Sequence, residues 1–277
     1  MQHTHISARQ SLFDLRLREF WQYRDLVWLF TRRSFKVSYM QTILGPLWLF
    51  LNPLLTSITY VVLFGNIAKL STDGVPQLLF YLSSHALWAF FAGCVSSNAS
   101  TFTDNANLFG KVYFPRLVMP VSSVLSRLIH FGIQMLMVLV LLFWYAAHGM
   151  VSPLWHLWPL LPLLLLQLGI LGMGVGIIIS SLTTKYRDLR ILVDFGMTLW
   201  MYATPVVYPL SAVNPSLRQL LRWNPVTPVI ELYRRVLLGV GQTDGVSLSC
   251  SILFTVVIAF VGVVMFNRIE RTFMDTV

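Results

Sequence analysis

The sequence predicts an all-α integral membrane protein with six membrane-spanning helices. Of the 277 residues, 56% are hydrophobic and 11% are charged, whereas an ordinary soluble domain is about 25% charged. The apolar residues also gather in runs with almost no charge, each about 20 residues long or longer. Runs of that length match a hydrocarbon core about 30 Å thick. Composition and patterning therefore indicate several membrane-spanning helices.

A basic N-terminal segment, residues 1–44, precedes the first span. It has no short apolar core ending in small residues, so we expect no cleavable signal peptide. Within it, residues 24–39 mix apolar side chains with Arg32, Arg33 and Lys36. This pattern is typical of an amphipathic interfacial helix. The alternative is a simple positively charged flank of the first span.

Six apolar runs follow this segment. Pro46 stands near the start of the first, where a missing N–H costs little. The fourth contains Gly172 and Gly176, a small-xxx-small pair that favours close helix packing. The predicted spans cover residues 45–68, 78–102, 117–147, 157–182, 191–208 and 246–266. We expect a transmembrane domain over residues 45–267 and a cytoplasmic tail over 268–277.

The basic residues predict the orientation of these spans. An even number of spans places both termini on one side of the membrane. If that side is the cytoplasm, fifteen Lys and Arg lie inside and five outside, as the positive-inside rule requires. The net charge of +9 therefore reflects membrane topology and does not indicate nucleic-acid binding.

The loop between the second and third spans, residues 104–116, is short and rich in aromatic and apolar side chains. Asp104 and Asn105 are possible N-caps, and Pro115 prevents a short helix from continuing into the third span. Such a helix exposes Leu108, Phe109, Val112, Tyr113 and Phe114 to water. An exposed apolar patch of this kind calls for a partner protein. Burial of the aromatics in the headgroup belt is the alternative.

Residues 205–245 are too long and too apolar for an ordinary loop. Prolines divide the segment, and residues 216–223 predict one short helix. Thr227 and Pro228 predict the start of a second helix, which Gly239 ends. Glu231 and Arg235 are spaced as an i,i+4 ion pair on it. Re-entrant helices at a pore mouth and a loop lying on the outer surface remain equal alternatives.

Catalytic and energy-coupling motifs are missing from the sequence. There is no P-loop and no HExxH motif. No predicted span carries the chain of acidic residues that proton-coupled transporters often use. Cys94 and Cys250 lie inside apolar runs and have no metal-ligand spacing. We expect no enzyme activity, no metal and no cofactor in this chain, and any energy for transport to come from another subunit.

Four stretches resemble the permease subunit of ABC-2 type polysaccharide exporters, of the O-antigen kind. They are residues 36–48, 107–116, 186–189 and 223–231. The resemblance implies a homodimer of six-span subunits with two cytoplasmic ATPase subunits, which hold the ATP and Mg²⁺. It also implies a lipid-linked polysaccharide substrate, carried on undecaprenyl diphosphate across the inner membrane of a bacterium.

The resemblance also implies roles for particular residues. The cation cluster of residues 32–36 would contact the lipid pyrophosphate, although Ser38 and Met40 stand where relatives often carry further basic residues. Aromatic faces suit sugar rings, but helix packing and interfacial belts are the more common explanation for any single aromatic residue. The coupling helix would use Asn107, Leu108, Phe109, Lys111, Val112, Tyr113, Phe114 and Arg116. The outer re-entrant helices would use Trp223, Asn224, Pro225, Pro228, Glu231 and Arg235. The channel candidates are Trp48, Tyr60, Trp88, Trp200 and Tyr202.

Other functions remain open at this point. The same architecture could export capsular polysaccharide, teichoic acid or another lipid-linked glycan. A membrane-embedded glycosyl- or phosphotransferase would need clustered acidic residues, and the eleven acidic residues here are scattered. A scaffold subunit without transport activity is the third class.

Overall fold

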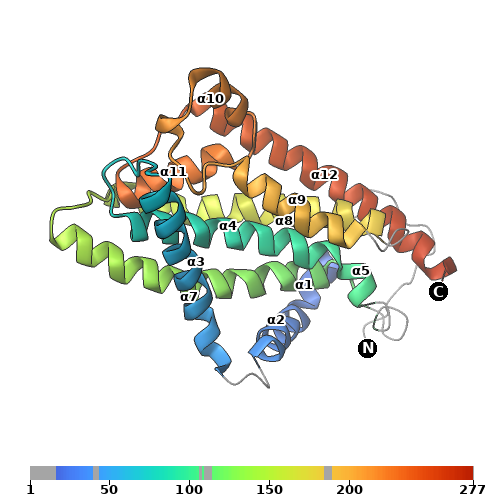
Figure 1. Cartoon of the computed structure of the whole chain (residues 1–277). Helices are drawn as coiled ribbons and strands as arrows, with labels where there is room; N and C mark the ends of the chain where they lie inside the picture. Colours follow the sequence, from blue (N-terminus) through green and yellow to red (C-terminus); the bar gives the residue numbers. More distant parts are fainter. Residues whose placement is uncertain (1–16, 40–43, 106–107, 109–113, 184–188, 277) are drawn as a thin grey trace.

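The computed structural model describes residues 17–39, 44–105, 108, 114–183 and 189–276 (Figure 1). Over these residues the secondary structure is helical and contains no strand. Within this described part of the chain, five helical segments are long and apolar enough to cross a membrane. They are Gly45–Ile67, Gln77–Ala99, Val118–Ala147, Trp155–Thr183 and Gly245–Phe266.

The described part of the first half of the chain begins with two helices in the N-terminal segment. The helices are α1 (Leu17–Gln22), α2 (Arg24–Tyr39), α3 (Trp48–Tyr60), α4 (Gln77–Ala99), α5 (Thr101–Asp104) and α7 (Val118–Ala147). A 3₁₀ turn at Gly45–Leu47 precedes α3, and π-helical turns at Val61–Ile67 extend it. Pro46 lies in the first turn of this span, as its position in the sequence predicts.

The second half contains two long helices and several short ones. A 3₁₀ segment at Trp155–Leu160 leads into α8. The helices are α8 (Leu161–Thr183), α9 (Leu189–Tyr202), α10 (Pro215–Arg222), α11 (Thr227–Leu238) and α12 (Gly245–Thr276). A further 3₁₀ turn covers Leu210–Ala212. Helix α12 continues without a break past residue 267, so the predicted tail begins within this helix.

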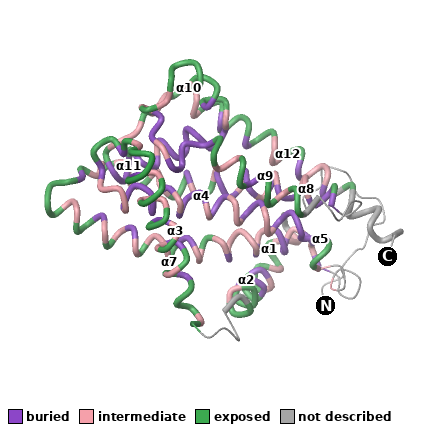
Figure 2. Tube along the Cα trace, in the orientation of Figure 1, coloured by how far each residue is buried: buried purple, intermediate pink, exposed green. Residues whose placement is uncertain are grey.

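Helix α4 lies at the centre of the bundle. It packs against α7 and α8, and α3 crosses it obliquely (Figure 1). Figure 2 shows buried residues along α4 and α11, whereas α3 and α12 carry many exposed residues and α7 is mainly of intermediate burial. Those exposed side chains are mostly apolar, which is expected of helices that face lipid or another membrane protein.

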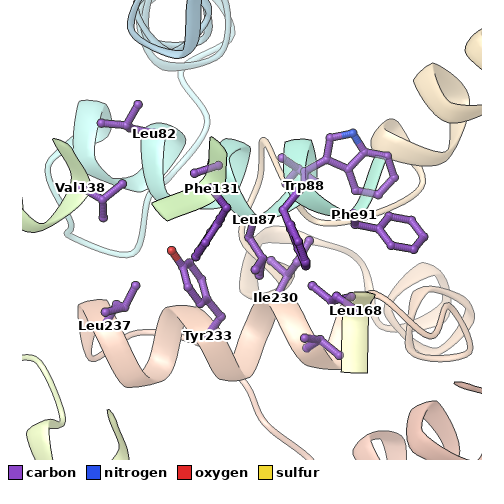
Figure 3. Close-up of a cluster of buried hydrophobic side chains, with 14 of the residues drawn as sticks. Leu82, Leu87, Trp88, Phe91, Phe131, Val138, Leu168, Ile230, Tyr233 and Leu237 are labelled. Atoms are coloured by element: carbon purple, nitrogen blue, oxygen red, sulfur yellow. The ribbon is translucent and has the colours of Figure 1, made fainter. Parts of the chain in front are cut away.

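The core extends from α4 to helix α11 (Figure 3). Trp88 and Phe91 of α4, Phe131 of α7, Leu168 of α8 and Tyr233 of α11 belong to one buried cluster. Helix α11 is thus packed into the bundle although it is too short to cross a membrane. The alternative that residues 205–245 form a loop on the outer surface is wrong for this helix.

The glycines of α8 explain its close contacts with two neighbours. A Cβ atom on Gly172 would lie 2.7 Å from the Cβ of Cys94, and one on Gly176 would lie 2.6 Å from the carbonyl oxygen of Val95, both on α4. On the other side, a Cβ on Gly174 would meet α12. The small-xxx-small prediction is therefore confirmed, because larger side chains would separate these backbones.

The fifth predicted span, residues 191–208, ends earlier than expected. Helix α9 ends at Tyr202, and its 14 residues rise about 21 Å at 1.5 Å each. That length is less than the roughly 30 Å of a hydrocarbon core. The chain then turns, and Thr204, Pro205, Val206 and Val207 are buried in an irregular segment. The predicted continuation of the helix to Tyr208 is therefore wrong.

Candidate functional site

One face of helix α2 packs against the bundle, and its basic side chains are exposed on the surface. Val27 and Phe30 are buried, and the hydroxyl of Thr31 donates to the carbonyl of Ser122 on α7 at 3.3 Å. Arg32, Arg33 and Lys36 are exposed. The guanidinium of Arg32 lies 5.0 Å from the ring centroid of the partly exposed Trp28. An exposed surface of aromatic and basic side chains suits the membrane interface.

Only part of the predicted coupling helix belongs to the described residues. Asn107, Phe109, Lys111, Val112 and Tyr113 lie outside them. Leu108 packs against the cluster that includes Phe30 and Phe114. The side-chain amide of Asn105 donates to the carbonyl of Thr101 at 2.9 Å, so it bonds back to α5.

Phe114 is buried, although its side chain was expected to face water. Its side chain is 5% exposed, and its ring centroid lies 5.9 Å from that of Phe30 on α2. Arg116 is also buried. The end of the loop therefore holds α2 against the start of α7. Sequence reasoning placed Phe114 with the exposed aromatics because burial against α2 depends on a contact between distant residues.

The segment of residues 205–245 is organised by a buried ion pair between Glu231 and Arg234. One guanidinium nitrogen of Arg234 lies 3.1 Å from Oε1 of Glu231, and the two side chains are 1% and 3% exposed. Burial lowers the pKa of Arg234 to about 10, and Glu231 opposes that shift, so the guanidinium stays charged at neutral pH. The predicted Glu231–Arg235 pair is wrong, since Arg235 is exposed and donates to Thr243.

Arg234 also satisfies the irregular backbone after α9. It donates to the carbonyl oxygens of Val206 at 2.7 Å and Tyr208 at 3.3 Å, and to the hydroxyl of Ser84 on α4 at 2.8 Å. Its guanidinium lies 4.1 Å from the ring centroid of Phe80. Buried carbonyls need such partners. One arginine thus joins α4, α11 and the segment between α9 and α10.

Sequence reasoning missed Arg234, although its spacing offered a signal. Arg234 stands four residues after Ile230 and three before Leu237, so it shares the apolar face of the helix with both. A cation on an apolar face is costly unless it is paired. Glu231, at i−3 on the same face, was the available partner. The pairing was assigned instead to the i,i+4 neighbour.

Asn224 fixes the turn between α10 and α11. Its amide donates to the carbonyl of Ala203 at 2.9 Å and to the hydroxyl of Thr204 at 2.8 Å. Its side-chain oxygen accepts from the indole N–H of Trp200 at 3.1 Å and the backbone N–H of Val226 at 3.1 Å. Asn224 therefore ties the end of α9 to the start of α11.

The other outer residues divide into exposed and buried ones. Trp223 is 76% exposed, whereas Pro225 and Pro228 are buried. Helix α11 ends at Gly239, whose φ of 76° is left-handed, as predicted. Thr227 is the first helical residue and makes no side-chain cap, so its predicted N-cap role is wrong.

The aromatic channel candidates lie in different environments. Trp48 and Tyr202 are exposed. Tyr60 is half-buried and packs edge-on against Tyr81 of α4 at 6.2 Å. Trp88 is 4% exposed and packs against Trp200 at 6.5 Å between centroids. We therefore remove Trp88 from the candidate channel surface, because its ring is enclosed by its own chain.

Comparison with known proteins supports one family over most of the chain. The family described as "ABC-2 type transporter" matches residues 25–238. The O-antigen export system permease protein RfbA of Myxococcus xanthus is 31% identical over 264 residues, which cover 94% of this chain and 98% of that protein.

Two further relatives extend the comparison. An O-antigen export system permease protein RfbA of Klebsiella pneumoniae is 29% identical, covering 91% of this chain and 94% of its own length. The polysialic acid transport protein KpsM of Escherichia coli is 22% identical, covering 88% of this chain and 93% of that protein. With its helical architecture and near full-length matches, the chain belongs to the ABC-2 type transporter membrane family.

Proposed function

We propose that this chain is the permease subunit of an ATP-driven exporter of lipid-linked O-antigen polysaccharide. The observation that carries the proposal is the end-to-end similarity to the Myxococcus xanthus protein, whose name is that of an O-antigen export permease. Similarity over 94% of the chain includes the loops as well as the spans. The substrate is a polyprenyl-diphosphate-linked glycan that passes from the cytoplasm to the far side of the inner membrane.

The exporter contains two copies of this permease and two ATPase subunits, which bind ATP and Mg²⁺. Five long helices and the short helix α9 make the six crossings in each copy. Both termini face the cytoplasm, as the distribution of Lys and Arg supports. Helix α9 crosses together with the buried segment that follows it. Irregular backbone at that depth is tolerated when it lies inside protein.

ATP binding drives transport through the loop at residues 104–116. Tyr113 and its neighbours dock on the ATPase, and movement of the loop passes to α2 through the Phe30–Phe114 contact. Helix α2 carries Arg32 and Arg33 at the interface, where they attract the diphosphate of the substrate. Both aromatic rings are buried in one cluster, and close-packed interiors transmit displacement between neighbouring side chains.

Glycan passes along a surface formed between the two permease copies. Its candidates are Trp48, Tyr60, Trp200 and Tyr202, with the outer helices α10 and α11 at the exit. Helix α11 is held in place by the Glu231–Arg234 pair, so we assign this pair to support of the exit. A capsular polysaccharide is the second candidate cargo, because the Escherichia coli relative is named for polysialic acid transport.

The coupling step can be tested with single substitutions. Tyr113→Ala is the informative variant, since Phe114 is buried and its loss would also disturb α2. We expect Tyr113→Ala to reduce both copurification of the ATPase and surface polysaccharide in cells that lack the native gene. Leu136→Ala, at an exposed site on α7, is the matched control. Normal copurification and normal surface polysaccharide with Tyr113→Ala would count against the coupling role.

The basic face of α2 has its own test. The triple variant Arg32→Gln, Arg33→Gln and Lys36→Gln should reduce surface polysaccharide while the ATPase still copurifies. This separation is expected because the three cations are exposed, whereas Phe30 and Phe114, which join α2 to the loop, are buried. Wild-type levels of surface polysaccharide in this variant would remove the three residues from the proposed mechanism.

A further inference from the structure

A polar cavity of about 320 Å³ lies between α3, α4 and α7. Its wall combines polar side chains with aromatic rings. The residues that matter to the argument are Trp48, Asn52, Phe90, Arg127, His130 and Gln134. A cavity with a cation and two amides is unusual within the apolar part of a membrane bundle, where polar side chains are costly and commonly functional.

Arg127 is the charged group of this cavity. Its Nε donates to the hydroxyl of Ser97 at 3.0 Å. Its aliphatic stem lies over Gly93, where an added Cβ would be 2.8 Å from the Cδ of Arg127. In the described part of the chain, no Asp or Glu forms an ion pair with Arg127. The guanidinium is held in place but its charge is not neutralised by this part of the protein.

The position of Arg127 along α7 places it within the hydrocarbon. The helix has 30 residues and is about 45 Å long at 1.5 Å per residue. A 30 Å core centred on it begins about 7 Å from its start. Arg127 lies nine residues after Val118, or about 14 Å along the helix. The guanidinium therefore belongs to the inner edge of the apolar layer, on the side of the bundle where α2 lies.

The cavity is next to the basic helix α2. Phe35 packs edge-on against His130 with 5.4 Å between ring centroids. Lys36 follows Phe35 directly and is exposed. His130 is itself oriented by a 2.6 Å hydrogen bond between its Nδ1 and the carbonyl oxygen of Ser126. A ligand that first contacts the basic residues of α2 therefore has a further cation, Arg127, close by and deeper in the membrane.

The chemical groups that line the cavity indicate which class of ligand it binds. A guanidinium presents several donors in one plane and matches phosphate oxygens bidentately. The side-chain amide of Gln134 also lines the cavity, and an amide NH₂ can donate to an anion. Trp48, Phe90 and Phe131 supply apolar walls for the chain attached to a phosphate. An anionic phosphate on a lipid satisfies all three features.

We propose that this cavity binds the diphosphate of the lipid-linked substrate after it leaves the surface of α2. The inference rests on the proposed export function and adds a second, membrane-embedded anion site to it. Arg127 is the principal contact, and Gln134 and Asn52 donate to remaining oxygens. Such a site lets the diphosphate enter the membrane while it stays paired with a cation, which lowers the cost of moving charge into hydrocarbon.

Binding of radiolabelled undecaprenyl diphosphate to the purified full-length permease in detergent tests the site. We expect Arg127→Gln to weaken binding at least tenfold and Arg127→Lys to weaken it less. Gly93→Ala keeps the charge but displaces the Arg127 stem, so it should also weaken binding. Arg222→Gln, which removes an exposed cation from α10, is the control and should bind like the wild type.

Competition identifies the source of the phosphate. Unlabelled undecaprenyl diphosphate should compete, whereas an equal concentration of phosphatidylglycerol or inorganic diphosphate should not. Equal competition by phosphatidylglycerol, or by inorganic diphosphate, would overturn the assignment to the substrate lipid. Wild-type affinity in both Arg127→Gln and Gly93→Ala would overturn the site itself.

The same variants separate this inference from the export function. If the wild-type gene restores surface polysaccharide and Arg127→Gln does so equally, the cavity assignment fails while the export function stands. If the wild-type gene does not restore surface polysaccharide in cells that contain the ATPase, the proposed function fails. We expect restoration by the wild-type gene and a clear reduction with Arg127→Gln.

Discussion

Replacing Arg234 by Met should destabilise the protein, and replacing Glu231 by Gln as well should restore part of the loss. Arg234→Met leaves the buried Glu231 carboxylate without its cation, and breaking a buried ion pair in this way costs about 3–5 kcal/mol. The double variant has no charged side chain at this buried site. It still loses donors to the carbonyls of Val206 and Tyr208 and to the hydroxyl of Ser84, worth about 1 kcal/mol each. We therefore expect a cost of about 3 kcal/mol for the double variant, less than for Arg234→Met alone, which loses the same donors and also leaves the Glu231 carboxylate unpaired.

A thiol-reactive dye can measure this difference in detergent. The sequence has two cysteines, and Cys94 is buried whereas Cys250 is exposed. In a Cys250→Ser background, the dye reports the temperature at which Cys94 becomes accessible. At about 2–4 °C per kcal/mol, Arg234→Met should lower the midpoint by about 6 °C or more.

Two results would refute this reasoning. A midpoint for Arg234→Met equal to the wild type would mean that the ion pair does not hold α11. A loss in the double variant equal to the sum of the single losses would mean that the two charges are not coupled. The single variant Glu231→Gln supplies the remaining corner of the cycle. Leu232→Ala, at a neighbouring position outside the ion pair, controls for substitutions in α11 as such.

Three further predictions address packing and topology. Gly176→Ala should lower the midpoint, at a cost of about 1–3 kcal/mol, because its Cβ would lie 2.6 Å from the Val95 carbonyl; Gly132→Ala, with nothing within 4 Å, should not. Phe114→Ala should cost about 3–5 kcal/mol and speed tryptic cleavage in α2, and unchanged cleavage would contradict the Phe30 contact. A cysteine at Asp73, in a chain without other cysteines, should react with an impermeant maleimide added to cells whose outer membrane is permeabilised; labelling only after lysis would reverse the orientation.

The five long spans were predictable because their signal is local. Each is a continuous apolar run, and its length alone separates it from the loops. The glycines of α8 were also readable, since Gly172 and Gly176 lie four residues apart and therefore share one face of the helix. The structure adds that Gly174 faces a different partner, α12. Which helix each glycine meets depends on the fold of the whole chain.

The end of α9 could not be predicted in the same way. Residues 203–208 are apolar enough to continue a span, and Pro205 was the available sign of a break. The chain turns there because Asn224 and Arg234, both distant in sequence, supply donors to Ala203, Val206 and Tyr208. An apolar run therefore predicted burial correctly, but the helical form of that burial was wrong.

The candidate site was predictable as a set of segments and less so residue by residue. The basic helix and the broken outer segment both followed from their composition. The burial of Phe114 and the choice of Arg234 over Arg235 depend on contacts between distant residues, which one sequence does not reveal. The Arg127 cavity likewise needs three helices to be placed together, although an arginine inside an apolar run was a visible sign.

Transport in a reconstituted system tests the central claim most directly. Proteoliposomes containing this permease and its ATPase would be loaded with polyprenyl-diphosphate-linked glycan, and glycan on the membrane face opposite the ATPase would be measured with and without ATP. The account predicts translocation that requires ATP, this chain and the ATPase together. Glycan that stays on the ATPase side while ATP is hydrolysed by the bound ATPase would contradict it.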